Sequence, residues 1–135
     1  MANPHKTITL RTTSREELLD LTQQVADVVR ASGVRTGLAW IMSPHTTAGI
    51  TIQENADPDV RADLLAHLRE LVPRSASFRH AEGNSDAHIK CSLMGSSHAV
   101  PIESGRLLLG TWQAIYFCEF DGPRSRRVVV KVVEG

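Results

Sequence analysis

The order of the expected elements predicts an α+β fold, because two helices come early in the chain and consecutive strands come late. The chain lacks the regular alternation of strands and helices that is typical of parallel sheets, so we expect a mostly antiparallel sheet. The length of 135 residues fits one compact domain over residues 1–135, with a single hydrophobic core. No internal repeat, linker or low-complexity segment divides the chain.

The first helix is expected after a strand at residues 6–12, which is rich in Thr, Ile and Leu. Ser14 and Glu17 have the spacing of a capping box with Ser14 as the N-cap, and Gly33 is placed to end the helix. Between these signals the apolar residues recur at helical spacing: Leu18, Leu21, Val25, Val28 and Val29.

Strand periodicity follows the first helix and stops at residues 43–44, which are Ser and Pro. One face of this strand is expected to hold the residues Val34, Thr36, Leu38, Trp40 and Met42. A further strand is expected at about residues 49–53, with Ile50 and Ile52 on one side.

The second helix is expected to begin at Asp57 and Pro58, because Asp is a favoured N-cap residue and Pro suits the first helical position. Pro73 closes the helix. Its apolar stripe consists of Val60, Leu64, Leu65, Leu68, Leu71 and Val72.

Strands dominate the chain after a polar stretch at residues 74–87. We expect them at about residues 88–94, 99–102, 106–120 (with room for a break) and 126–133. Turns suited to hairpins separate them at residues 103–105 and 121–123. The two cysteines, Cys91 and Cys118, are too few for a disulfide scaffold, and Cys91 is expected to be a buried free thiol.

Charge and composition argue against several classes of protein. Fifteen basic and fifteen acidic residues give no net charge, and no basic stripe is present, which argues against a nucleic-acid partner. The start of the chain does not resemble a secretion signal, and no window approaches the roughly 20 apolar residues of a membrane span. We therefore expect a cytoplasmic protein with no membrane partner.

Three of the six histidines lie in polar clusters that interrupt the patterned chain. His45 follows the end of a strand, and His80 lies within the polar stretch. His88 is expected to open a strand on which Lys90 and Ser92 share its face. Imidazoles with carboxylates nearby suit zinc and similar divalent ions. Their spacing matches no local metal motif, so a metal site and three scattered polar histidines both stay open.

Hydroxyl-rich turns offer sites for an anion. Thr46 and Thr47, and also Ser96 and Ser97, combine hydroxyls with backbone N–H groups in turns. The same residue types are common in ordinary turns, so this signal alone does not establish a site. The basic run at residues 124–127 is either a charged turn or a contact for phosphate on a small ligand.

Gln113 and Glu119 share one face of an apolar strand with Ile115 and Phe117. A buried polar group without a partner costs about 2–7 kcal/mol, so both side chains need partners. Three alternatives stay open: they line a site, they contribute to a contact between subunits, or they belong to a hydrogen-bonded network in the core.

Long blocks of this sequence resemble the YjbQ family. Residues 43–48 and 53–58 are similar to its first block, and residues 79–90 are similar to its second. Residues 95–97 and 109–124 resemble the remainder, and the blocks occur in the family's order along nearly the whole chain.

The resemblance implies a YjbQ-like α+β fold, a homotrimer, and a pocket that the histidine-bearing blocks build at the boundaries between subunits. It implies that His45, His80 and His88 are the metal ligands. The residues that it places around them for catalysis are Glu54, Asn84 and Gln113. Phosphate groups of the substrate are expected to contact Thr46, Thr47, Lys90, Ser96 and Ser97.

Members of the family are commonly named secondary thiamine-phosphate synthases. The resemblance therefore implies an enzyme that joins a pyrimidine methyl diphosphate to a thiazole phosphate and releases diphosphate, with a divalent metal ion as cofactor. Histidines suit zinc, whereas the departure of diphosphate usually uses magnesium on carboxylates. This mismatch keeps two alternatives open: a metal-dependent hydrolase of a phosphate ester or amide, and a non-enzymatic trimer that binds a metal or small ligand.

Overall fold

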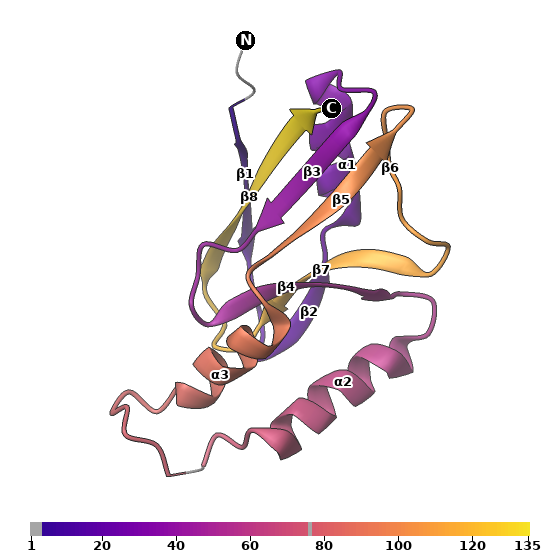
Figure 1. Cartoon of the computed structure of the whole chain (residues 1–135). Coiled ribbons are helices and arrows are strands. Elements are labelled where there is room, and N and C mark those ends of the chain that lie inside the picture. The colour runs from indigo at the N-terminus through magenta and orange to yellow at the C-terminus, as the bar shows by residue number, and fades with distance from the viewer. Residues whose placement is uncertain (1–3, 76) are drawn as a thin grey trace.

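The computed structural model describes residues 4–75 and 77–135, which fold into two antiparallel sheets and three helices (Figure 1). The larger sheet has the order β1 (Lys6–Arg11), β8 (Ser125–Glu134), β3 (Gly37–Met42), β5 (Ser97–Glu103) and β6 (Arg106–Leu107). The smaller sheet has the order β2 (Glu17–Asp20), β7 (Gln113–Glu119) and β4 (Ala48–Glu54). The helices are α1 (Thr22–Ser32), α2 (Pro58–Leu71) and α3 (Ser85–Met94). This architecture confirms the predicted α+β class with antiparallel sheets.

The main core lies between the two sheets and α1. Val25 and Val29 of α1 pack with Ile41 of β3 and with Ile115 and Phe117 of β7. The opposite face of β7 carries Cys118, which packs in a second cluster with Leu68 of α2, Ala87 and Cys91 of α3, and Phe120 directly after β7. Figure 1 shows α2 and α3 together on the side of the smaller sheet that faces away from the larger one. Strand β7 therefore divides the two clusters.

The predicted start of the first helix at Ser14 is wrong. Glu17 does accept hydrogen bonds from the backbone N–H of Thr13 and Ser14, at 2.7 and 2.8 Å, but these bonds close a turn before a strand. Strand β2 then pairs with β7, placing Leu19 opposite Phe117. This pairing overrides the helical spacing of the apolar residues. The predicted end is confirmed, because Gly33 caps α1 in the left-handed conformation, with φ of 74°.

The predicted strand at residues 88–94 is also wrong, because this segment belongs to the third helix, α3. Asp86 and Lys90 are both buried and form an ion pair at 3.0 Å, because the i,i+4 spacing of a helix brings their side chains together. His88 consequently does not begin a strand. Strand alternation predicted that His88, Lys90 and Ser92 share one face. In the helix they do not, since Lys90 is buried, His88 is half-buried and Ser92 is exposed.

The other predicted elements are observed. Asp57 caps α2 by accepting a hydrogen bond from the Asp59 N–H at 2.9 Å, and Pro58 occupies the first turn. The long strand expected at residues 106–120 is broken into β6 and β7. Cys91 is a buried free thiol, as predicted. Of the helices in the described ranges, none combines the length and the hydrophobicity that crossing a membrane requires.

Strand β3 has the predicted periodicity, but its larger apolar side chains face outward. Leu38, Trp40 and Met42 are exposed, whereas Ala39 and Ile41 are buried in the core. The alternation therefore identified the two faces of the strand without identifying which face contacts the core.

Candidate functional site

Three segments that are far apart in the sequence meet around two neighbouring hollows. The first hollow, of about 330 Å³, is lined from the loop after β3, the start of α3 and the loop after β7. The second, of about 530 Å³, extends along α3 to the loop that follows it. Both hollows are lined by His45, Thr46 and His88, so we treat them together as the histidine site.

The loop after β3 is closed by its own hydrogen bonds, which fixes the backbone around His45. The Ser43 hydroxyl donates to the Ala48 carbonyl at 2.7 Å and accepts the His45 backbone N–H at 3.4 Å. The His45 ring meets the Phe117 ring edge to face, with 6.3 Å between centroids. The strand end and the core therefore hold this imidazole in one orientation.

His45 is a neutral hydrogen-bond donor at this position. Its Nε2 accepts the backbone N–H of Arg127 at 3.0 Å, so the ring proton lies on Nδ1. Burial lowers the pKa of His45, and the nearby charge of Arg126 lowers it further. The ring therefore offers an Nδ1–H donor, and its accepting nitrogen is already used.

His80 and His88 lie next to each other. Their rings are edge to face with 5.5 Å between centroids, and His80 Nε2 lies 3.6 Å from a carboxylate oxygen of Glu82. Within the described ranges, no three side chains of His, Cys, Asp or Glu are arranged to hold a metal ion. The metal site assigned to His45, His80 and His88 stays a prediction. A single chain brings these histidines near one another without forming a three-ligand group.

A buried ion pair lies beneath the histidine site. Arg126 donates from Nε to a carboxylate oxygen of Glu119 at 2.8 Å and from Nη2 to the other oxygen. The same Nη2 donates to the Thr47 hydroxyl at 2.9 Å, and the Thr12 hydroxyl donates to Glu119 at 2.7 Å. Burial alone would raise the pKa of Glu119, but the hydrogen bonds from Arg126 and Thr12 outweigh it and hold this pKa below its ordinary value. Of the three alternatives for Glu119, the hydrogen-bonded core network is the one observed.

The wall of the first hollow contains a buried acceptor without a donor. Asn84 donates from Nδ2 to Asp121 at 2.9 Å, but its Oδ1 is buried and has no hydrogen-bond partner among the described residues. Asp121 also pairs with Arg124 at 3.2 Å. Arg124 is exposed and lines the hollow, so its guanidinium lies at the rim. An unpaired buried polar atom costs about 1–3 kcal/mol, which is a typical sign of a position where a ligand or water donates.

Several residues assigned to the site from the sequence lie elsewhere. Lys90 is 1% exposed and pairs with Glu16 at 2.8 Å and with Asp86, so its ammonium group is not free for phosphate. Gln113, the first residue of β7, accepts the N–H of Gly110 in the preceding loop at 2.8 Å. Glu54 ends β4 and Ser97 begins β5, and neither lines the histidine site. By contrast, Thr46, Thr47, Asn84 and Ser96 all line it.

The site also contains Asp121, which the sequence prediction did not assign to it, and Arg126, for which a phosphate contact was one of two open alternatives. A signal for Arg126 is present in the sequence. Arg126 shares strand parity with Val128 and Val130, and Glu119 has the parity of Phe117. Two opposite charges at core-facing positions of different strands indicate a buried pair, because either charge alone would be too costly to bury.

The family model described as UPF0047 protein YjbQ-like matches residues 6–135. UPF0047 protein YugU of Bacillus subtilis is 51% identical over 95% of this chain and 98% of its own length. A UPF0047 protein of Methanocaldococcus jannaschii is 52% identical over 92% and 90%. A solved structure of the yjbq/upf0047 family from Clostridium acetobutylicum has a TM-score of 0.94 and 53% identity, covering 95% of this chain and 99% of that one. A YbjQ-like protein of unknown function from Sulfolobus solfataricus has a TM-score of 0.94 at 32% identity, with coverage of 98% and 97%.

Proposed function

The chain belongs to the YjbQ-like family, as its sequence blocks predicted, and we propose that its histidine site binds a phosphate-bearing small molecule. The proposed activity is of the secondary thiamine-phosphate synthase kind, in which a pyrimidine methyl diphosphate and a thiazole phosphate are joined. The observation that carries the proposal is the set of donors around one hollow. These donors are the Arg124 guanidinium, the Thr46 hydroxyl and backbone, and the Nδ1–H of His45.

The proposed reaction needs stabilisation of a leaving diphosphate. The thiazole nitrogen forms a bond to the methylene carbon of the pyrimidine fragment, while the bond from that carbon to the diphosphate oxygen breaks and its electron pair leaves with diphosphate. Negative charge grows on that oxygen in the transition state. Preorganised donors aimed at it lower the barrier, and guanidinium suits phosphate because it offers two parallel N–H groups. In this proposal Arg124 and His45 supply such donors, Arg124 mainly from Nη1, because its Nε and Nη2 donate to Asp121.

A resident metal ion is not assigned a step in this reaction. Catalytic zinc sites use three protein ligands, and magnesium prefers carboxylate oxygens. His80 and His88 supply two neighbouring imidazoles, while the accepting nitrogen of His45 is bonded to the Arg127 N–H. The residues of one chain therefore do not fit a metal ion that is held by three histidine ligands. The reaction is assigned instead to the hydrogen-bond donors of the hollow.

The decisive experiment supplies both half-substrates, and then each one alone, to purified protein with and without a chelator. Product that requires both half-substrates supports the synthase activity. Phosphate released from a single substrate supports the hydrolase alternative, and binding without turnover supports a non-enzymatic ligand-binding protein. Arg124→Gln should reduce turnover about tenfold or more, because a charge-assisted hydrogen bond to phosphate is lost. Full turnover by this variant would remove the assigned role of the hollow.

We also propose that three copies assemble through the outer face of the larger sheet, which comprises the exposed side chains of Leu38, Trp40, Met42 and Val133. The number three comes from the family resemblance. The support for the surface is its apolar character: Leu38 lies in register with Pro101 on one side and Val133 on the other. Contiguous exposed apolar patches of this kind mark interaction surfaces. Met42 is three residues from His45, so a neighbouring copy on this face would lie beside the histidine site.

A further inference from the structure

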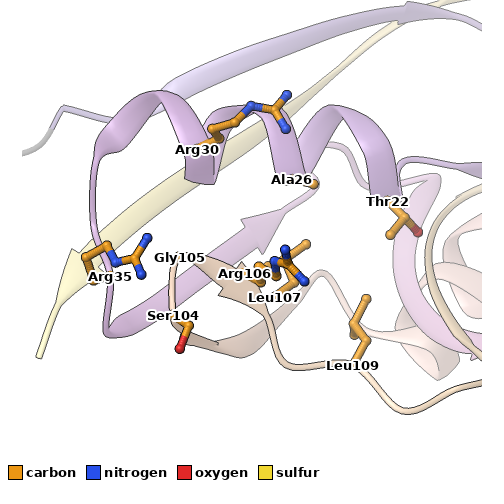
Figure 2. A pocket seen from close by; sticks show the side chains of 9 residues that line it. All are labelled: Thr22, Ala26, Arg30, Arg35, Ser104, Gly105, Arg106, Leu107 and Leu109. Carbon is orange, nitrogen blue, oxygen red and sulfur yellow. The ribbon is translucent and has the colours of Figure 1, made fainter.

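A separate hollow, with chemistry different from that of the histidine site, lies between α1 and the turn that joins β5 to β6. It has a volume of about 750 Å³ and is lined by three arginines, Arg30, Arg35 and Arg106. Figure 2 shows Arg35 and Arg106 in the space between the helix and the turn, whereas Arg30 extends along the helix. None of the described residues that line it is acidic. We call this cavity the arginine hollow.

Two of these arginines are free to bind a ligand. Arg30 is paired with Asp27 on the same helix. The side chains of Arg35 and Arg106 make no ion pair or hydrogen bond with any residue in the ranges 4–75 and 77–135. Two unneutralised guanidinium groups in one cavity favour an anion, and their planar N–H pairs match the oxygen atoms of a phosphate group.

The turn holds the backbone of Arg35 in place before any ligand arrives. Ser104 and Gly105 both have positive φ, 51° and 76°, as a tight hairpin turn requires. The Gly105 N–H donates to the Arg35 carbonyl at 3.0 Å. A Cβ atom at position 105 would lie 3.1 Å from Nη1 of Arg35, so the absence of a side chain at Gly105 lets the guanidinium lie close to the turn. The turn therefore fixes the backbone of Arg35 and leaves room beside itself for the side chain.

The arginine hollow also has an apolar part. Ala26, Leu107 and Leu109 line it beside the guanidinium groups, as Figure 2 shows. A ligand that satisfies both parts has a phosphate group attached to an apolar body. We infer that the arginine hollow binds a phosphate monoester of a small organic molecule, at a site separate from the histidine site.

The two sites lie at opposite ends of the larger sheet. Arg35 precedes β3 and His45 follows it, and the six residues of β3 span about 20 Å. Ser104 follows β5, whereas Ser96 precedes it, so the second strand gives the same separation. One small ligand cannot occupy both sites, and the inference therefore does not depend on the proposed reaction.

Calorimetric titration with phenyl phosphate and with inorganic phosphate tests this site. The titrations use the Arg124→Gln protein, so that phosphate binding at the histidine site is weakened in every sample. Phenyl phosphate should bind more tightly than inorganic phosphate because of the apolar part, and it should shift the NMR signals of the Arg35 and Gly105 amides. Arg35→Gln and Arg106→Gln should each weaken binding about tenfold. Arg74→Gln, at an exposed position outside both sites, should leave binding unchanged.

Two further results decide the outcome. Arg35→Lys should recover only part of the affinity, because lysine keeps the charge but lacks the paired N–H groups. The side chains of Arg35 and Arg106 have no hydrogen-bond or ion-pair partner among the residues that the structure describes, so their variants should retain the melting temperature of the parent protein. Equal binding by the Arg35→Gln, Arg106→Gln and parent proteins would overturn the inference. Binding that is seen with Arg124 intact and disappears entirely in Arg124→Gln would also overturn it, because that result places the phosphate only in the histidine site.

Discussion

His45 shows how one backbone contact selects the chemistry of a side chain. The Arg127 N–H occupies Nε2, which leaves Nδ1–H as a donor, and burial together with Arg126 lowers the pKa of the ring. A neutral imidazole with a fixed donor suits an anionic oxygen, whereas a metal ion needs a free lone pair. This residue therefore supports phosphate recognition more directly than metal ligation.

The lowered pKa of His45 makes a prediction about stability and pH. The unfolded chain takes up a proton near the ordinary value of 6.5, and the folded chain takes it up only at lower pH. The free energy of unfolding should therefore fall as the pH drops from 6.5 toward the lower pKa of the folded protein. We expect His45→Asn to reduce this loss, because asparagine does not titrate and its oxygen can accept the Arg127 N–H. Urea unfolding of both proteins between about pH 7.5 and about pH 5 measures the difference; parallel curves would contradict the assignment.

The buried pair of Glu119 and Arg126 makes a second prediction. Glu119→Gln removes the negative charge and leaves the Arg126 guanidinium buried without its counter-ion, which should cost about 3–5 kcal/mol of unfolding free energy. The matched control is Asp27→Asn, which breaks the exposed pair with Arg30 and should cost no more than about 1 kcal/mol. Urea denaturation of the three proteins gives both values. Similar losses of unfolding free energy in Glu119→Gln and Asp27→Asn would show that the buried pair contributes no more to stability than the exposed one.

At the scale of elements, α3 is held to the rest of the chain by charged groups. Asp86 accepts hydrogen bonds from Nη1 and Nη2 of Arg15, at 3.1 and 3.0 Å, and also pairs with Lys90. Burial alone would raise the pKa of Asp86, but the hydrogen bonds from Arg15 and Lys90 outweigh it and keep this pKa below its ordinary value. These pairs fasten α3 to the segment before β2, and α3 in turn positions Asn84 and His88 at the histidine site.

The position of Lys90 predicts a variant that affects stability but not ligand binding. In Lys90→Met both carboxylates keep an arginine partner, because Arg15 remains on Asp86 and Arg69 remains on Glu16. The loss should therefore be about 1–3 kcal/mol of unfolding free energy. The affinity for inorganic phosphate should stay unchanged, since the ammonium group pairs with Glu16 and Asp86 and lines neither part of the histidine site. Calorimetric titration of Lys90→Met beside Arg124→Gln tests this. A loss of phosphate affinity in both variants would show that Lys90 contributes to the binding site.

The sequence predicted best the elements whose ends carry their own chemical signals. Asp57 and Pro58 mark the start of α2, and Gly33 marks the end of α1, because these residues act through bonds formed within a few positions. The strand β2 and the helix α3 depend on contacts with distant segments instead. Leu18 and Leu19 pair with β7, and Lys90 pairs with Glu16, and neither contact can be read from local periodicity.

The residues of the candidate site were also predicted only in part from the sequence. Its histidines and threonines were found because they lie in polar clusters where a core residue would otherwise be expected. Lys90 was assigned to phosphate because a strand would expose it, and α3 buries it instead. Arg126 and Asp121 entered the site only through the folding of β8 and the loop before it against the loop after β3.

At the scale of the whole molecule, the larger sheet connects three surfaces. The histidine site lies at one end of β3 and β5, the arginine hollow lies at the other end, and the outer face of the sheet lies between them. The inner face of the same strands contributes Ile41 and Val100 to the core. An association of chains through the outer face would therefore leave the core unchanged and would bring neighbouring copies close to both sites.

The proposed trimer depends on this outer face and makes the final prediction. Trp40 is 53% exposed, so Trp40→Ser removes a large apolar contact between copies without opening a cavity in the folded chain. Sedimentation equilibrium should give about three times the 14.8 kDa of one chain for the parent protein and a mass near that of one chain for the variant. Trp112→Ser is the matched control, because Trp112 is 61% exposed but lies in the loop before β7, outside the outer face, and should leave the mass unchanged. A trimer that persists in Trp40→Ser would place the interface elsewhere on the molecule, and a parent protein with the mass of one chain would remove the trimer itself.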